Sequence, residues 1–458
     1  MAYVRKAKKR PYADQVFKFI ADFPDLIYDG MIKCKVCQID LQCWDKGACR
    51  RHVNSTRHIK NQNGVTPKTQ FMFDLLFVLV TCGVPFLILD RLPFREFWKK
   101  YCPDVDLPSR TALRNYVTTV REDVVNRIKC ALKNKRLWLC VDETTDCKKN
   151  SIVNVIVRVM DPLKPTVPLL LASKRLTECT GQTITWVVLE TLAKFQVPPS
   201  QVLMLVTDGD TTMRLVGRYL QEQGCRLLHV TCKVHALHLV AERIRKCFPE
   251  VDALIASTEK VFLKSPKHLR AFHAQCPGVR EPSQSILTRF GTWLEAALYY
   301  AQYFQQIKVV VLQFNPAEAA GAKESQTKFR DISIETDLQI VRNNYKGLYG
   351  SIEKLQNGAL SLVESLQILD EVDTLLHTID DARNDRVLEE FESVKKDSDF
   401  ITLKQISDGV STNPLTEFKE CFNYACVTST DVERSFTKYK HIFRQGEHVS
   451  MRQLWKHI

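Results

Sequence analysis

The sequence predicts an α/β protein with a small metal-binding unit near its N-terminus. Hydrophobic runs of strand length recur between residues 137 and 230, and helical apolar spacing dominates from residue 235 to about residue 400. Two cysteines followed by two histidines near the N-terminus are typical of a zinc-binding unit. A chain of 458 residues is long enough for several domains of this kind.

Four side chains within residues 1–66 form a predicted structural zinc site, namely Cys34, Cys37, His52 and His58. Two thiolates and two imidazoles suit tetrahedral Zn²⁺. The cysteines would lie on a tight turn, followed by a strand over residues 39–44 and a helix over residues 45–58 that carries both histidines. Free thiols in a small core are the alternative, but the unit has too little apolar mass to fold well without a metal. Cys43 and Cys49 fit core or surface thiols better.

The predicted finger helix also carries side chains suited to DNA, which are Lys46, Arg50, Arg51, Asn54 and Arg57. The cations could contact phosphates, whereas base reading would require Arg50 or Asn54 to enter a groove. A finger that binds protein is the alternative. The basic run from Arg5 to Arg10 is typical either of a nuclear-import or phosphate-contacting patch or of a solvated tail.

Residues 67–135 form a predicted helical DNA-binding or dimerisation region, which follows a polar linker. Within it, the apolar stretch from Phe71 to Leu89 contains Asp74 and Pro85. This pattern predicts a buried helix that ends before Pro85, rather than a membrane span.

Residues 136–240 carry the predicted β-rich core. One strand ends at Asp142, two more cover residues 152–160 and about 167–172, a helix covers residues 183–195, and a fourth strand ends at Asp208. Three consecutive strands, a helix and another strand, with acids on the first and fourth strands, is the order of a ribonuclease-H-like fold.

Residues 241–415 form a predicted α-helical insertion, and residues 416–458 return the chain to the β-rich core. This last part contains a predicted amphipathic helix over residues 430–440, capped by Thr430 or Asp431. That helix carries Glu433, the third of three separated acids.

The three acids Asp142, Asp208 and Glu433 could converge on Mg²⁺ or Mn²⁺. Such a trio suits phosphoryl transfer, because two ions about 3.5 to 4 Å apart can activate the attacking oxygen and stabilise the leaving one. The acids nearest the hydrophobic strands are preferred, because strand ends hold ligands rigidly. Three neighbouring acids fit loop or capping roles better, namely Glu143, Asp146 and Asp210.

Composition favours a nucleic-acid partner and a reducing compartment. The net charge of +13 and the pI near 9.0 favour a polyanion such as nucleic acid. Sixteen cysteines are scattered singly and no signal peptide precedes them, which predicts reduced thiols in the cytosol or nucleus.

The order of these motifs resembles an hAT-type DNA transposase with an N-terminal BED-like zinc finger. The motifs are the finger, VDETTD, VTDGD, the pair Cys232 and His235, the segment Thr288 to Trp293, and ERSF at Glu433. The finger is also similar to that of the CGG triplet-repeat-binding protein. The resemblance implies a ribonuclease-H-like catalytic domain interrupted by a helical insertion, with the three acids as its metal-binding triad. It further implies excision at transposon ends, strand transfer into double-stranded target DNA, homo-oligomers and a nuclear location.

The resemblance also implies an active-site role for His235, near the scissile phosphate. With His238 close by, a core histidine or another zinc ligand is the alternative. Where the family often has an Arg-Trp pair that stacks on a displaced base, this chain has Arg289 and Phe290, with Trp293 three residues later. Phe290 or Trp293 could stack on a base, although an aromatic at helical spacing is more often core. The chain is short for the family, which predicts a reduced insertion or dimerisation surface.

Two other functions stay open beside the metal-dependent transposase. One is a transposase-derived host DNA-binding protein or transcription regulator that no longer cuts, and the other is an unrelated ribonuclease-H-like nuclease. Retention of three acids favours the enzyme, because a binding protein has no chemical need for them.

Overall fold

The computed structural model describes residue 16 and residues 19–28, 31–34, 36–37, 39–41, 45–55, 58, 67–146, 148–263, 265–282, 290–317 and 321–444, without the side chains of residues 40, 67–70, 119 and 441–444. The chain divides into two compact units, one that extends to Glu122 and one that begins at Asp123. Helix α6 (Arg110–Leu132) runs across this division. The finer domain boundaries expected near residues 66, 135, 240 and 415 stay predictions.

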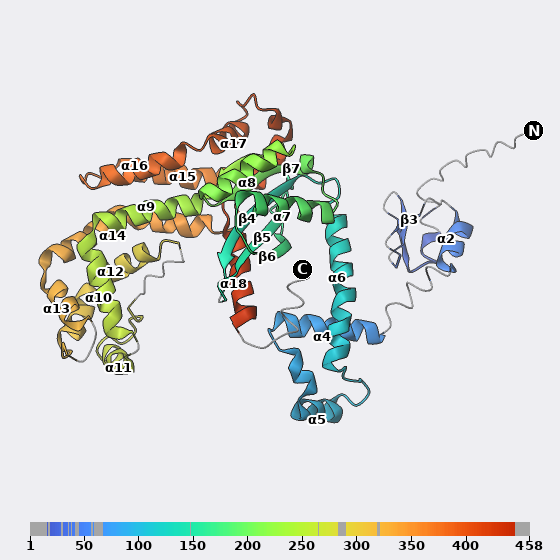
Figure 1. Ribbon diagram of the computed structural model, residues 1–458, viewed down its shortest axis with the longest axis horizontal. Coiled ribbons are helices and arrows are strands. Elements are labelled where there is room, and N and C mark those ends of the chain that lie inside the picture. The colour runs from blue at the N-terminus through green and yellow to red at the C-terminus, as the bar shows by residue number, and fades with distance from the viewer. Residues whose placement is uncertain are drawn as a thin grey trace, which may run out of the picture. The chain divides into compact units, whose positions relative to one another are not determined.

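The first unit contains a three-stranded antiparallel sheet and the short helix α2 (Figure 1). The elements are β1 (Leu26–Tyr28), β2 (Ile32–Cys34), β3 (Ile39–Leu41) and α2 (Lys46–Val53). The predicted helix over residues 45–58 is too long, because α2 ends at Val53 and Asn54 caps it through its backbone N–H. His58 therefore lies beyond α2, although it is itself in a helical conformation. Residues 42–44 of the predicted strand, and Cys43 with them, lie outside the described residues.

After the small sheet and α2, the same unit contains α4 (Pro67–Thr81), the 3-10 helix η1 (Phe86–Asp90) and α5 (Leu92–Tyr101), which lead to α6. Helix α4 ends before Pro85 as predicted, and Gly83 follows it with a φ of 66°. Its burial is only partial, because Leu76 is buried whereas Phe77 is 61% exposed. In the described part of the chain, no helix has the length and apolar character needed to cross a membrane.

Five strands of the second unit form one mixed sheet in the order β6-β5-β4-β7-β8 (Figure 1). They are β4 (Leu137–Thr145), β5 (Ser151–Val159), β6 (Leu169–Leu176), β7 (Val202–Thr207) and β8 (Leu228–Thr231). The strands β4, β5 and β6 form an antiparallel meander, whereas β7 and β8 run parallel to β4. Helix α7 (Gly181–Lys194) connects β6 to β7, and helix α8 (Thr211–Glu222) connects β7 to β8. The predicted α/β class is confirmed.

Several strand boundaries differ from the prediction, most clearly the end of β4 and both ends of β6, which spans Leu169–Leu176. Strand β4 continues past Asp142 to Thr145, because Glu143, Thr144 and Thr145 pair with the start of β5 in a hairpin. Strand β6 begins at Leu169, directly after Pro168, which has no N–H to donate to a strand ladder. Helix α8 and strand β8 were not predicted.

Each face of the sheet is buried, and alternation along the strands separates two cores. On β4, Leu139 and Val141 pack with α7 and α8, whereas Trp138 and Cys140 belong to the core shared with the later helices. Asp142 continues this second series. The acid therefore points to the face that the C-terminal part of the chain covers.

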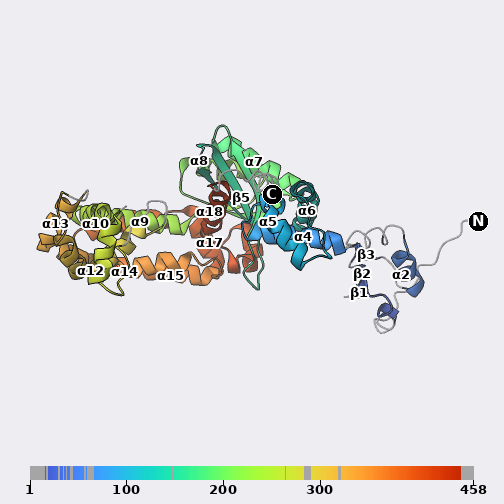
Figure 2. The ribbon, with the colours of Figure 1, turned by 90° about the horizontal axis from the view of Figure 1, so that it is seen from below.

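A long helical segment separates β8 from the last helix (Figures 1 and 2). Its elements are α9 (Lys233–Cys247), α10 (Pro249–Phe262), α11 (Pro266–Gln275), α12 (Thr292–Leu312), α13 (Ala322–Arg330), α14 (Ile332–Leu355), α15 (Leu362–His377), α16 (Asn384–Lys395), α17 (Ser398–Asp408) and the 3-10 helix η3 (Pro414–Tyr424). The last described helix, α18 (Thr430–Arg444), follows. Helical structure predominates in this segment, as predicted.

The edge strand β8 is covered by carboxylates from the start of α17. Asp397 Oδ2 accepts hydrogen bonds from the backbone N–H of Thr231 at 3.0 Å and from Lys233 Nζ at 3.1 Å. Asp399 Oδ2 accepts the backbone N–H of His229 at 2.6 Å. Two N–H groups of the edge are thereby satisfied, which removes part of the template that an exposed edge offers to another chain.

His229 is packed tightly between β7 and α8. Its Nε2 lies 2.8 Å from Thr207 Oγ1, and a Cβ at Gly217 of α8 would lie 2.0 Å from its Nδ1. Burial lowers the pKa of His229 to about 4, against a partial opposing effect of Asp397 and with a further lowering by Arg214. The ring is therefore neutral in the folded protein near pH 7.

We expect His229 to make stability fall as the solution becomes acidic. Because its pKa is lower in the folded state, its contribution is present above pH 6.5 and is lost as pH falls towards 4. The loss should reach about 3 kcal/mol, from 1.36 kcal/mol per pKa unit. Denaturant unfolding at several pH values should give a shallower decline for His229→Gln, which stays neutral. An equal decline in both proteins would contradict the assignment.

Candidate active site

Asp142 and Asp208 occupy equivalent positions on two neighbouring parallel strands. The last pair between β4 and β7 is Cys140 with Val206, so Asp142 and Asp208 each lie two residues beyond it. Cys140 and Val206 belong to the same core, and alternation places both acids on that face. The N–H of Glu143 donates to Asp142 Oδ1 at 2.8 Å, and the N–H of Asp210 lies 3.3 Å from Asp208 Oδ1.

Helix α18 covers this face through polar contacts with β5. Asn154, which pairs with Asp142 across the strands, donates from Nδ2 to Ser435 Oγ at 2.7 Å. Arg158 donates from Nε to Asp431 Oδ2 at 2.7 Å. The predicted cap at Thr430 or Asp431 is wrong by at least one residue, because α18 begins at Thr430 and both residues lie in its first turn. The Asp431 carboxylate binds Arg158 instead. Asn154 and Ser435 are 281 positions apart in the chain, and Arg158 and Asp431 are 273 positions apart. The fold brings each of these pairs together.

Glu433 and His235 meet beside the two strand acids. His235 Nε2 lies 3.7 Å from Glu433 Oε1, and its other ring nitrogen, Nδ1, lies 3.3 Å from Ser429 Oγ. The histidine comes from the first turn of α9, and both partners come from the start of α18 or the residue before it. Both side chains are accessible, with exposed fractions of 27% for His235 and 38% for Glu433.

The side chains of Asp142, Asp208, Glu433 and His235 influence one another's pKa values and so form one cluster. Burial raises the pKa of Asp142 well above its ordinary value, and the negative charges of Glu433 and Asp208 add to that rise. Burial also raises the pKa of Asp208, while the Asp210 N–H and His235 act in the opposite direction. Burial lowers the pKa of His235, and the carboxylates of Glu433 and Asp208 oppose this. The acids repel one another, a strain that a bound cation would relieve.

The charge balance of the cluster fits a divalent cation. Among the described residues, no lysine or arginine forms an ion pair with Asp142 or Asp208. Carboxylate oxygens are the ligands preferred by Mg²⁺. The three acids could therefore hold such an ion. They do not, however, each bring an oxygen within 4.8 Å of the other two in the described structure.

A second acidic group lies on the helical segment and already has a cation. Asp373, His377 and Glu392 have ligand atoms within 4.8 Å of one another. Lys395 Nζ lies 3.1 Å from Asp373 Oδ1 and 2.6 Å from Glu392 Oε1. Lys395 therefore neutralises this surface group.

Phe290 is close to the cluster, whereas Trp293 is not available to a ligand. The Phe290 ring packs edge-on against His235, with centroids 4.6 Å apart, and its neighbour Gly291 has its N–H 3.4 Å from His238 Nδ1. Trp293 is only 2% exposed and belongs to the core. Arg289 lies outside the described residues.

Cys232 and His238 have structural contacts. The buried Cys232 Sγ accepts the N–H of Ser429 at 3.1 Å, and Phe290 packs against His238 with centroids 5.9 Å apart. Within the described residues, Cys232, His235 and His238 do not form one of the compact ligand groups. The zinc-ligand alternative for His235 therefore has no geometric support here.

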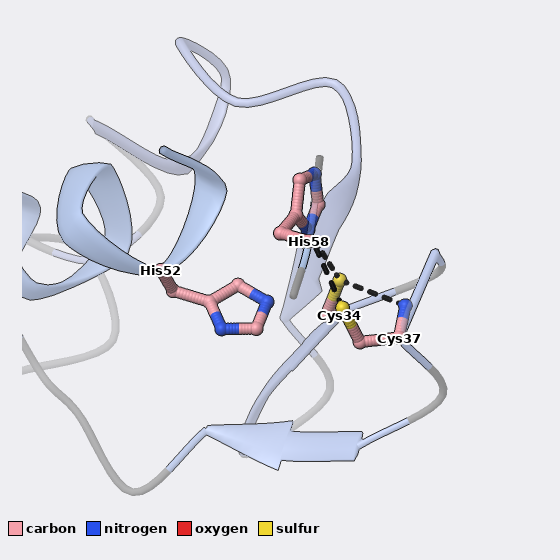
Figure 3. A group of neighbouring side chains, drawn as sticks. All are labelled: Cys34, Cys37, His52 and His58. Carbon is pink, nitrogen blue, oxygen red and sulfur yellow. Dashed lines mark hydrogen bonds between the residues drawn. The ribbon is translucent and has the colours of Figure 1, made fainter. Parts of the chain in front are cut away.

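The predicted zinc ligands of the first unit do come together (Figure 3). The ligand atoms of Cys34, Cys37, His52 and His58 all lie within 4.8 Å of one another. His58 Nδ1 lies 3.3 Å from Cys34 Sγ and 3.5 Å from Cys37 Sγ. The chain thus has a group of two cysteines and two histidines that could hold a metal ion.

Contacts around this group fit a metal site. His58 Nε2 lies 3.3 Å from Asp25 Oδ2, which is the carboxylate contact typical of a metal-bound histidine. Burial raises the pKa of the Cys34 thiol, and the N–H of Cys37, which donates to Cys34 Sγ at 3.2 Å, acts in the opposite direction and favours the thiolate form. Cys49 is buried in the small core and is not part of the group.

The predicted DNA-contacting side chains of the finger are exposed where they are described. Arg50 and Arg51 lie in α2, Asn54 follows it, and all three are exposed. Lys46 is also exposed and forms an ion pair with Asp22. Arg57 lies outside the described residues.

Sequence reasoning missed the side chains that hold α18 in place. Asn154, Arg158 and Ser429 carry no motif of their own. The available signal was two polar residues within the apolar run of β5, SIVNVIVRV, where each interrupts a buried face.

The sequence matches no protein-family model and no curated protein.

Proposed function

We propose that this protein is a metal-dependent DNA transposase of the hAT type, with a ribonuclease-H-like catalytic domain. The observation that carries the proposal is the convergence of Asp142, Asp208 and Glu433 from two strands and a distant helix, beside His235. The strand order β6-β5-β4-β7-β8, with three antiparallel strands followed by two parallel ones, supports the fold assignment. In this proposal the helical segment between β8 and α18 would be the insertion of such a domain.

Each residue of the cluster has a proposed role. Asp142, Asp208 and Glu433 would hold Mg²⁺ or Mn²⁺, and bound ions of this kind activate an attacking oxygen and stabilise the leaving one. Ligands of two ions about 3.5 to 4 Å apart need not lie within 4.8 Å of one another, so the spacing of the acids does not oppose the proposal. His235, accessible beside Glu433, would donate a hydrogen bond to the scissile phosphate.

Phe290 is the proposed stacking residue for a displaced base, because it is the partly accessible aromatic ring beside His235. Trp293 would support it from the core. Arg289 remains a proposed DNA-binding residue.

The first unit would deliver the DNA. We assign Zn²⁺ to the group around Cys34, and DNA phosphates to the exposed Lys46, Arg50 and Arg51. Asn54 would contact bases and Arg57 a phosphate. Double-stranded transposon ends and target DNA are the proposed partners, in a nuclear homo-oligomer, in keeping with the net charge of +13.

The second candidate is a transposase-derived DNA-binding protein without cleavage activity. The raised pKa values of Asp142 and Asp208 favour the enzyme, because a group of mutually repelling acids costs stability that DNA binding alone does not require.

Cleavage with cognate end DNA distinguishes these candidates. We expect the full-length protein with Mg²⁺ or Mn²⁺ to cut its own terminal sequence at a defined end and to join that end to target DNA. Binding alone does not decide, because both candidates bind DNA in a salt-dependent way. Tight sequence-specific binding to the authentic ends, with no metal-dependent strand break, would favour the binding protein.

A further inference from the structure

Arg158 has an unusual position for a charged side chain. It lies one residue before the end of β5, on the covered face, where its side chain is 8% exposed and that of its partner Asp431 is 4% exposed. Nε and Nη2 donate to the same Asp431 oxygen, at 2.7 and 2.6 Å. Burial of such a pair is costly unless its remaining hydrogen bonds are satisfied.

The remaining donors of Arg158 reach a part of the chain outside the sheet. Nη1 donates to the carbonyl oxygen of Gly358 at 2.7 Å and to that of Thr166 at 3.1 Å. Gly358 lies in the turn between α14 and α15, within the helical segment. One guanidinium therefore binds both α18 and the helical segment.

Arg434, which belongs to α18, forms a second contact between this helix and the α14–α15 turn. Arg434 Nη2 donates to the carbonyl oxygen of Gln356 at 2.7 Å, and its Nη1 lies 3.7 Å from Asp431 Oδ1. The space at the turn is narrow, because a Cβ at Gly358 would lie 2.6 Å from Arg158 Nη2. Glu433 lies between Asp431 and Arg434, so both contacts fix the turn of helix that presents it.

We propose that Arg158 is a positioning residue for Glu433, and that it makes the placement of this acid depend on docking of the α14–α15 turn. The inference rests on the proposed function, since it concerns the third metal ligand of that site. In this arrangement the helical segment, although it supplies none of the three acids, completes the site.

The test uses full-length wild type, Arg158→Lys and a control that removes another arginine–carboxylate contact, Arg243→Met. Lysine keeps the charge of Arg158 but cannot reproduce its planar set of donors. Arg243 likewise donates from Nε and Nη2 to one oxygen of Glu390, at 3.1 and 2.8 Å, and lies away from α18 in the helical segment. We measure Mn²⁺ affinity, the Mg²⁺ concentration that gives half-maximal cleavage, and amide hydrogen exchange over residues 430–434.

We expect Arg158→Lys to weaken Mn²⁺ binding and to raise the half-maximal Mg²⁺ concentration, each by about 10- to 100-fold, which is the effect typical of an outer-shell partner. Hydrogen exchange over residues 430–434 should become faster, and Arg243→Met should change none of these. A purely structural role would reduce the folded fraction and leave the metal dependence of the folded protein unchanged. An unchanged metal dependence in folded Arg158→Lys would overturn the proposal.

Two further variants keep the test decisive. If Arg158→Lys does not fold, Arg158→Met with Asp431→Leu removes both buried charges, and the same shift in metal dependence is expected. An unshifted value in that double variant would overturn the proposal. Gly358→Ala, which crowds Arg158 from the turn, should shift metal dependence in the same direction, and no shift would exclude the coupling to the helical segment.

Hydrogen exchange separates this inference from the proposed function. If the wild type neither binds Mn²⁺ nor cuts DNA, the proposed function fails. Faster exchange over residues 430–434 in Arg158→Lys, but not in Arg243→Met, would still support the positioning of Glu433. Unchanged exchange would overturn it.

Discussion

Replacing Asp208 by asparagine will lower metal-dependent cleavage by more than about 100-fold, because loss of an outer-shell partner alone costs about 10- to 100-fold in metal affinity or activity. Asparagine preserves the shape of the side chain and removes one negative charge from the cluster with Asp142 and Glu433. Cleavage of end DNA by the full-length protein is the measurement. DNA binding should survive, because the exposed cations of the finger are unchanged.

Asp210→Asn is the matched control, since Asp210 lies two residues from Asp208 and caps α8 through the N–H of Thr212 at 2.9 Å. Asparagine is as good an N-cap as aspartate, so this variant should keep both stability and cleavage. Undiminished cleavage by Asp208→Asn, or an equal loss in both variants, would refute the role of Asp208.

Removal of zinc will unfold the small core that surrounds the Cys34 group, up to about residue 60, and leave the sheet of the second unit folded. The small core around Val16 and Ile32 has little apolar mass, so metal binding should provide most of its folding free energy. We expect one zinc ion per chain by mass spectrometry. Chelator should make residues up to about 60 sensitive to protease, an expectation from the coupling of metal binding and folding.

Three variants test which residues bind the zinc ion. Cys37→Ser removes a ligand and should abolish zinc retention, and Asp25→Asn should weaken zinc affinity by about 10- to 100-fold through the contact to His58. Cys49→Ser should keep zinc, because Cys49 lies outside the ligand group. Zinc loss from Cys49→Ser alone would show that the ligand set is wrong.

The sequence predicted the elements that a local pattern determines. The apolar runs of β4 and β7 located two strands. The helix after β6 was also predicted, but the capping box of Thr180 and Thr183 starts it at Gly181, two residues before the predicted start. Strand β8, with only four residues and half-buried alternate positions, is too short to give a clear pattern. The same applies to the true end of the finger helix, which depends on how the backbone turns after Val53.

Side-chain partners of the candidate site depended on contacts that no local pattern contains. Asp431 fits a helix cap in sequence, yet its partner Arg158 is 273 residues earlier. The sequence alone does not tell whether Phe290 or Trp293 could stack on a base. In the fold, Phe290 is partly accessible, whereas Trp293 is buried. The acids themselves were visible because each follows an apolar run or starts an amphipathic helix, and such runs have local signals.

The cover of β8 has a consequence for the order in which the chain folds. Asp397 binds the backbone N–H of Thr231 and is synthesised 166 residues after it. Asp399 binds the backbone N–H of His229 and is synthesised 170 residues after it. During synthesis, at about 5 to 20 residues per second, the edge of β8 stays unprotected for roughly 10 to 30 seconds. A nascent chain therefore passes through a period in which this edge can pair with another nascent chain, and that period closes only when α17 leaves the ribosome.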